Sequence, residues 1–483
     1  MTTGGGPRSD AATAIASFVL FALLLASPLP FGSVQPPYVL GIELGAALAG
    51  GLAAWIVWRD PGRLSGAGRV GLALAGAVLL IGGAQLLPLP RSLVAVLAGP
   101  TVEARDGIAL AIDAPLPRWM PLTLSPPATV DALLRWSAYL AIGLAAAVCI
   151  RSERQRLVAA GLLSLAGAFQ ALYGSAEYLS GHQHIFWYPK RYFTDEASGT
   201  FINRNHFAAY LSICLPLAAA ATLDGYRRLR AVGVRWRVLV LLTEAGGSWV
   251  VLAAVATASI WIGIVLSFSR GGLAASLVGI TILVGGLLRR KRGAVWLLAL
   301  LAIPTAALLA MEVRAPGARF VTEADHLADF GGRLEVWTAT GEIVGDYPLA
   351  GAGFGTFQPI FQLYRHPATR KLWDHAHNDW LQAAAEGGVA LPLLMLGLLV
   401  VGWKRASASP GDVIGLAILA ALVAIAVHSA VDFALRIPAI AVSTAFLVGC
   451  ACGGDLAAPR RLWNHRSPGR VRSSESRCPT PPP

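Results

Sequence analysis

The sequence predicts an all-α polytopic membrane protein with about twelve transmembrane helices and a large extracytoplasmic loop. Of its 483 residues, 55% are hydrophobic and only 14% are charged. A soluble fold could not hide that much apolar surface from water, so lipid is the expected solvent. Apolar runs long enough to cross a bilayer recur along the chain. The predicted spans are 14–33, 38–58, 69–88, 129–150, 157–178, 206–223, 247–268, 272–288, 294–311, 387–403, 412–431 and 438–453.

These spans divide the chain into four segments. Residues 1–311 hold the first nine spans and a smaller outer loop at 179–206, and residues 312–386 form the large outer loop. Residues 387–458 hold the last three spans, and the Arg-, Ser- and Pro-rich residues 459–483 are expected to be a disordered cytoplasmic tail. The first span is long and no clear cleavage site follows it, so we interpret it as a retained anchor.

Basic residues predict the orientation, because cationic loops are kept on the cytoplasmic side. With both termini in the cytoplasm, most of the 39 Lys and Arg residues lie inside and most of the 27 Asp and Glu residues lie outside. The net charge of +12 is therefore a topology signal and does not indicate nucleic-acid binding. All five cysteines fall in spans or in the tail, where a structural disulfide is not expected.

The smaller outer loop mixes aromatic side chains with cations and amides. Rings at headgroup depth combined with guanidinium groups suit an anionic lipid headgroup. An aromatic belt with snorkelling cations is the alternative for Lys190 and Arg191. Arg204 is the stronger candidate, because it stands at a helix entrance between Asn203 and Asn205.

An arginine also stands between two apolar runs that have no polar loop around them. The segment is Ser267–Gly272, and Arg270 is its cation. A charge at that depth usually faces a protein interior or a water-filled cavity and has a partner, which favours a functional role. Snorkelling from a helix end is the alternative.

The large outer loop supplies a glycine cluster and a histidine pair. The glycines of 348–357 lack the flanking strand and helix and the phosphate-binding lysine of a nucleotide loop, and a tight turn explains them. His377 is a candidate base, because a neutral imidazole accepts a proton near pH 7. His375 could be structural. The two histidines could also bind a metal with Asp374 and Asp379, but the i,i+2 spacing is not that of zinc hydrolases, and we expect no metal.

The order of these motifs resembles the O-antigen ligase and O-antigen polymerase superfamily over about residues 203–391. No single motif is very specific, but the ordered set is. One position departs from the family pattern: Leu391 stands where members often have a small residue, so helix packing there is expected to differ. The motifs are Asn203–His206, Ser269–Gly271, Gly332–Arg333 with Trp337, Pro348–Phe357, and His377–Asn378 with Leu381, Glu386 and Gly388.

The resemblance implies a multi-span, lipid-donor glycosyltransferase in the inner membrane of a bacterium. Such an enzyme moves a glycan from an undecaprenyl-pyrophosphate carrier to an acceptor hydroxyl at the periplasmic face, with inversion and without a metal or cofactor. The acceptor is lipid A-core in ligases, a growing glycan in polymerases and a protein in related oligosaccharyltransferases.

Site residues follow from the resemblance as well. Arg270 and His377 are the expected catalytic residues, with Arg270 on the pyrophosphate and His377 as the base or acceptor-positioning group. The expected substrate-binding residues are Arg204, Arg333, Asn205, Asn378 and Arg191.

Elementary chemistry agrees with this assignment. A departing pyrophosphate gains negative charge, which fixed guanidinium groups stabilise without a metal. A transporter or flippase of lipid-linked glycans is the rival class, but its charges should lie near the membrane midplane, often in broken helices of matching halves. Here the candidate residues gather at one face, which favours an enzyme. A non-catalytic assembly scaffold is the third possibility.

Overall fold

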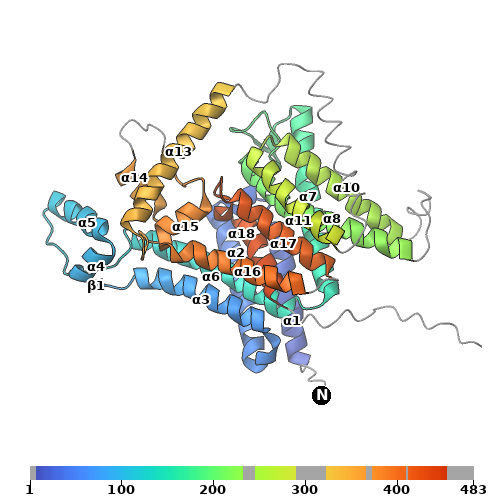
Figure 1. The fold of residues 1–483 in the computed structure, drawn as a ribbon, viewed down its shortest axis with the longest axis horizontal. Coiled ribbons are helices and arrows are strands. Elements are labelled where there is room, and N and C mark those ends of the chain that lie inside the picture. The colour runs from blue at the N-terminus through green and yellow to red at the C-terminus, as the bar shows by residue number, and fades with distance from the viewer. Residues whose placement is uncertain (1–6, 232–244, 290–322, 366–371, 409–411, 454–483) are drawn as a thin grey trace, which may run out of the picture.

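The computed structural model describes residues 7–231, 245–289, 323–365, 372–408 and 412–453. Within these ranges the chain is almost entirely helical, which confirms the all-α class (Figure 1). Among the described residues, eight helices are long and apolar enough to cross a membrane, and α17 and α18 are shorter apolar helices. The predicted span 294–311 and tail 459–483 lie outside the described residues. The bundle helices are α1 (Pro7–Ala26), α2 (Pro36–Arg59), α3 (Gly66–Gln85), α6 (Pro126–Cys149), α7 (Glu153–Ser180), α8 (Arg204–Ala231), α10 (Ala245–Leu266), α11 (Arg270–Arg289), α16 (Ala390–Ala408), α17 (Val413–His428) and α18 (Pro438–Cys452).

Local chemistry fixes several helix ends. Helix α1 stops at Ala26, earlier than predicted, because Pro28 and Pro30 follow and cannot continue a helical hydrogen-bond ladder. A 3-10 turn, η1 (Phe31–Ser33), then leads into α2. A second one, η2 (Pro61–Arg63), joins α2 to α3. Helix α7 begins with a capping box formed by Ser152 and Gln155 and ends at Gly181, whose φ of 73° suits a glycine.

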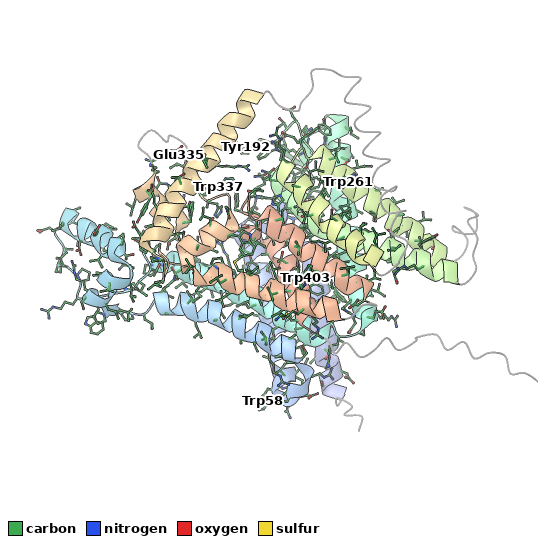
Figure 2. All side chains as sticks on the ribbon, in the orientation of Figure 1. Trp58, Tyr192, Trp261, Glu335, Trp337 and Trp403 are labelled. Carbon is green, nitrogen blue, oxygen red and sulfur yellow. The ribbon has the colours of Figure 1, made fainter. Side chains whose placement is uncertain are left out.

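Helix α8 lies at the centre of the bundle. It contacts α7, α10, α11 and α17, and its spanning window is 94% buried. Small residues let helices approach closely elsewhere in the bundle. A Cβ added at Gly263 would lie 2.9 Å from that of Ala171, and one added at Gly449 would lie 2.2 Å from the main-chain oxygen of Gly143. Large apolar side chains such as Trp58 and Trp403 instead project from the outside, as expected of a surface that faces lipid (Figure 2).

A third outer segment, which the hydropathy pattern does not predict as a separate unit, joins α3 to α6. It holds β1 (Leu89–Pro90), α4 (Arg91–Leu97), α5 (Gly99–Ala111) and β2 (Trp119–Met120), and the two strands pair antiparallel. Val94 and Met120 pack in one apolar cluster with Ile343 and Tyr347 of the large outer loop. The two outer segments therefore support each other.

The large outer loop is itself mostly helical where it is described. It holds α13 (Glu323–Asp346), α14 (Phe357–Tyr364) and α15 (Asp379–Gly387), which lie together at one end of the bundle (Figure 1). A hairpin of β3 (His184–Ile185) and β4 (Tyr188–Pro189) follows α7, and η3 (Ala434–Arg436) lies between α17 and α18. Helix α15 and the start of α8 both contact η3, so three distant parts of the sequence meet there.

Candidate functional site

Three histidines surround Phe433, which lies in the connection between α17 and α18. The ring centroids of His375 and His377 lie 4.5 and 4.7 Å from that of Phe433, and the ring of His206, from the first turn of α8, lies 4.7 Å away. Residues far apart in the sequence thus form one cluster.

His377 pairs with a buried carboxylate. Its Nδ1 lies 3.3 Å from Oδ1 of Asp432, and the two side chains are 20% and 2% exposed. Trp373 packs edge-on against the His377 ring at 5.1 Å. Burial opposes the ionisation of Asp432, but the His377 imidazole and its neighbours outweigh burial and hold the pKa of Asp432 below its usual range. A carboxylate on Nδ1 orients the ring and leaves Nε2 able to accept a proton.

A second buried network lies beside this pair. Arg436 Nη2 donates to Glu386 Oε2 at 3.0 Å, and Arg436 Nε lies 3.9 Å from Asp379 Oδ1. Burial raises the pKa of Asp379 to about 7, although Arg436 acts in the opposite direction. Gln382 donates to Glu386 at 2.8 Å and lies 3.3 Å from His375 Nδ1. Burial, together with the charge of Arg436, lowers the pKa of His375 to about 3, so His375 is neutral near pH 7.

The cluster opens on a polar cavity of about 380 Å³. A larger cavity of about 480 Å³ shares Arg135, Asp374, His375 and Arg436 with it. From there the larger cavity continues between α3, α6, α16 and α18 along an apolar wall that includes Leu72, Leu144, Leu399 and Val448. The polar cavity is lined by Val34, Val39, Arg135, Leu372, Trp373, Asp374, His375, His377, Phe433, Arg436, Ile437 and Pro438. An amphiphile with a charged head and a long apolar tail matches this shape.

Two of the arginines predicted from the sequence, Arg204 and Arg333, make contacts with other parts of the protein. Arg204 pairs with Glu196 and stacks over Phe193 at 5.9 Å. Arg333 Nη1 donates to the main-chain oxygen of Val431 at 3.1 Å. Neither lines the two cavities described above.

Arg270 is exposed and begins α11. The adjacent Gly271 packs so closely against the α17–α18 connection that an added Cβ would lie 2.9 Å from Val431 Cγ2. The α11 N-terminus is thereby held beside the histidine cluster. Arg270 itself does not line either cavity.

The predicted amides and Arg191 have more peripheral positions. The side chain of Asn378 caps α15 by accepting a hydrogen bond from Leu381 N at 3.0 Å. The main-chain N–H of Asn205 donates to the Asn203 side chain at 2.8 Å. Arg191 is exposed in the loop after β4.

Sequence reasoning missed three residues of the site. Asp432 and Arg436 lie just beyond the predicted span 412–431. They belong to the short connection between that span and the next, which carries no recognisable motif. Arg135 lies inside the predicted span 129–150 and lines both cavities. The signal for Arg135 was present, because an arginine within an apolar run is a functional candidate by the same reasoning as for Arg270.

A comparison with known families agrees with the motif order. Residues 252–396 match the family model of the O-antigen ligase. Over these residues the chain is similar to the O-antigen ligase family. The predicted resemblance to the O-antigen ligase and O-antigen polymerase superfamily is confirmed over this part of the chain. No curated protein matches the chain.

The O-antigen ligase match contains some site residues and leaves others outside. Arg270, Arg333 and His377 lie within residues 252–396, whereas Arg135 and Asp432 do not. The departure at Leu391 also has a structural setting. Its side chain is 1% exposed and packs with Phe354, and a Cβ added at Gly387 would lie 2.7 Å from Leu391 Cδ2. The larger residue therefore fills the space beside the end of α15.

Proposed function

We propose that this protein is an inverting, metal-independent glycosyltransferase that moves a glycan from an undecaprenyl-pyrophosphate carrier to an acceptor hydroxyl at the periplasmic face. One observation carries the proposal: the His377–Asp432 pair opens on a polar cavity whose residues Arg135 and Arg436 also line a long apolar cavity. The polar part suits the sugar and pyrophosphate, and the apolar part suits the isoprenoid chain.

In the proposed reaction, His377 Nε2 takes the proton of the acceptor hydroxyl. The hydroxyl oxygen forms a bond to the anomeric carbon while the bond from that carbon to the pyrophosphate oxygen breaks, and the electron pair leaves with the pyrophosphate. Attack from the face opposite the leaving group inverts the anomeric carbon. Asp432 stabilises the imidazolium that forms, and a positioned base of this kind contributes typically 10²–10⁴-fold to the rate.

Cations would stabilise the charge that develops on the leaving group. Arg436 already forms an ion pair with Glu386 at 3.0 Å, so its charge is committed to the protein. Arg135 forms no ion pair with a described residue and faces both cavities, which makes it the better ligand for a phosphate. Arg270, Arg204 and Arg333 would bind the remaining phosphate and sugar groups at the rim, with Asn205, Asn378 and Arg191 further out.

The positions of the helix ends support a reaction on the periplasmic side of the membrane. The starts of α8, α11 and α18 and the end of α17 lie at the same end of the bundle as the outer loops. The distribution of basic residues supports placing that end at the periplasmic face, with both termini in the cytoplasm, and we propose a bacterial inner membrane as the setting. The grouping of titratable side chains at one end supports an enzyme over a flippase.

Transfer in proteoliposomes tests the proposal. The protein would be supplied with a lipid-pyrophosphate glycan and, in parallel, with lipid A-core, repeat-unit glycan and protein acceptors. We expect transfer to one acceptor class, its loss in Arg270→Ala and His377→Ala, and little change on deleting residues 466–483. Wild-type rates in both point variants, with all proteins inserted, would contradict the site.

A further inference from the structure

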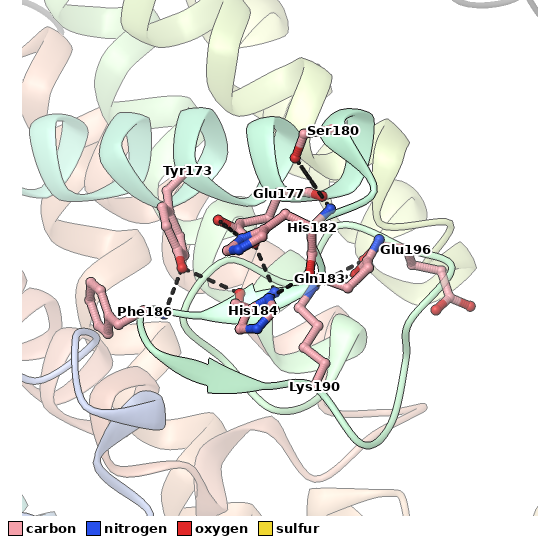
Figure 3. A network of polar contacts seen from close by, with 9 residues as sticks. All are labelled: Tyr173, Glu177, Ser180, His182, Gln183, His184, Phe186, Lys190 and Glu196. Carbon is pink, nitrogen blue, oxygen red and sulfur yellow. Dashed lines mark hydrogen bonds and ion pairs between the residues drawn. The ribbon is translucent and has the colours of Figure 1, made fainter.

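A compact group of metal-binding side chains lies where α7 ends and the β3–β4 hairpin begins (Figure 3). Glu177 comes from the last turns of α7, His182 follows the terminal glycine, and His184 begins β3. One ring nitrogen of each histidine and one carboxylate oxygen of Glu177 all lie within 4.8 Å of one another. It is the one such group in the described ranges of the chain.

The backbone turn places the two imidazoles together. Gly181 and Gln183 both have positive φ, 73° and 53°. The rings of His182 and His184 consequently stack, with centroids 3.9 Å apart and planes 21° apart. Positive φ is costly for Gln183 and persists where surrounding contacts determine it. The chain thus adopts an unfavourable turn that gathers ligands.

The hydrogen bonds of the two histidines are compatible with metal binding through a ring nitrogen of each. His184 Nδ1 donates to the main-chain oxygen of His182, so the lone pair of His184 resides on Nε2. Metal-bound histidines commonly donate their other ring N–H to a carbonyl in this way. His182 Nδ1 lies 2.9 Å from Glu177 Oε2, and that oxygen also accepts from His184 N at 2.8 Å. A cation could replace the proton shared by His182 and Glu177.

We propose that Glu177, His182 and His184 bind a divalent transition metal of the zinc class. Two imidazole nitrogens and one carboxylate oxygen, with water in the fourth position, suit Zn²⁺ and also Ni²⁺ or Cu²⁺. Mg²⁺ and Ca²⁺ prefer all-oxygen sites and fit this group poorly. Lys190 is the nearby cation, but its Nζ donates to Gln183 and to the main-chain oxygen of Glu196 (Figure 3).

The metal would fasten the outer loop to α7. Beyond the hairpin, Lys190 contacts Glu196, and Glu196 pairs with Arg204 at the start of α8. Binding therefore fixes the segment that leads to the candidate active site. This role is structural, independent of the proposed glycosyl transfer, and consistent with chemistry that uses no metal.

Metal binding by the full-length protein in detergent tests the proposal. Chelator-treated protein would be titrated with Zn²⁺ by calorimetry and with Co²⁺ by absorption spectroscopy. We expect one equivalent of Zn²⁺ and the visible bands of tetrahedral Co²⁺. His182→Ala/His184→Ala should abolish both signals, and Glu177→Gln should weaken Zn²⁺ binding by at least about tenfold. His465→Ala, a histidine of the tail, is the matched control and should bind as the wild type does.

Two results would overturn the site. One is a wild-type protein that binds no Zn²⁺ and gives no Co²⁺ bands, which would leave Glu177 and His182 as an ordinary ion pair. The other is equal stoichiometry in the wild type and in the double variant, which would place the metal elsewhere, for example on His375 and His377. Because glycan transfer is not the readout, failure here is distinguishable from failure of the proposed function.

Discussion

Arg333 of α13 donates a hydrogen bond to the main-chain oxygen of Val431, 98 residues further along the chain. This contact fastens the large outer loop to the connection between α17 and α18. Asp432, the partner of His377, is the next residue in that connection. Arg333 therefore has a positioning role in the described geometry, in addition to any contact it makes with substrate.

The first prediction concerns the His377–Asp432 pair. His377→Ala should lower kcat by about 10²–10⁴-fold, because it removes the base, with a smaller effect on KM for the donor. Asp432→Asn should lower kcat in the same direction, because the neutral amide cannot stabilise an imidazolium. Steady-state transfer assays measure both. Unchanged kcat in Asp432→Asn, with the protein folded, would show that the carboxylate does not assist.

Some of this site was predictable from sequence and some was not. His377 and Arg270 were recognisable as candidates because each is a polar residue beside an apolar run within an ordered set of motifs, although Arg270 lines neither cavity. Asp432 and Arg436 were not, because their importance arises from tertiary contacts with His377 and Glu386, more than 45 residues away. Arg204 was recognisable as a cation, whereas its pairing with Glu196 depends on the fold of the loop.

The fold, like the site, was only partly predictable from the sequence. Eleven predicted spans correspond to helices because hydropathy and length largely determine a transmembrane helix. The helical segment between α3 and α6 was missed, because α4 and α5 are short and their stability comes from contacts such as that of Val94 with Ile343. Long-range packing of that kind leaves no periodic signal in one sequence.

A second prediction separates the roles of the two neighbouring histidines. His375 has a pKa lowered to about 3 by burial and is neutral throughout the neutral range. His375→Asn should therefore leave the acidic limb of the pH profile of kcat/KM in place, even if the rate falls. A displaced limb would mean that His375 itself titrates in this range and is not held neutral by burial. Profiles of wild type and variant between about pH 5 and pH 8, the range in which histidines titrate, make the comparison.

Arg135 provides the third prediction. Arg135 faces both cavities and is not neutralised by a described carboxylate. Arg135→Ala should therefore weaken donor binding, because it removes a charge-assisted contact with phosphate worth about 1.5–3 kcal/mol. The expected effect is a higher KM for the lipid donor, with KM for the acceptor little changed. Arg118→Ala, an exposed arginine between α5 and β2, is the control. An unchanged donor KM would remove Arg135 from the phosphate site.

The last prediction concerns stability and pH at Asp379. Burial raises its pKa in the folded protein to about 7 from its ordinary value of 3.8. Between these values the folded state holds a proton that the unfolded state has released, so this group makes stability fall as pH rises from about 4 to 7. The limiting slope is about 1.4 kcal/mol per pH unit. His375 contributes the opposite slope, because the unfolded chain binds a proton there below its ordinary pKa.

Comparison with Asp379→Asn isolates the contribution of Asp379 from that of His375. The amide resembles the protonated acid, so the variant and the wild type should have similar stability near pH 4. The variant should then gain relative stability as the pH approaches 7. Thermal or denaturant unfolding in detergent across this range measures the difference. A stability difference that does not change with pH would mean that Asp379 stays ionised beside Arg436 in the folded protein.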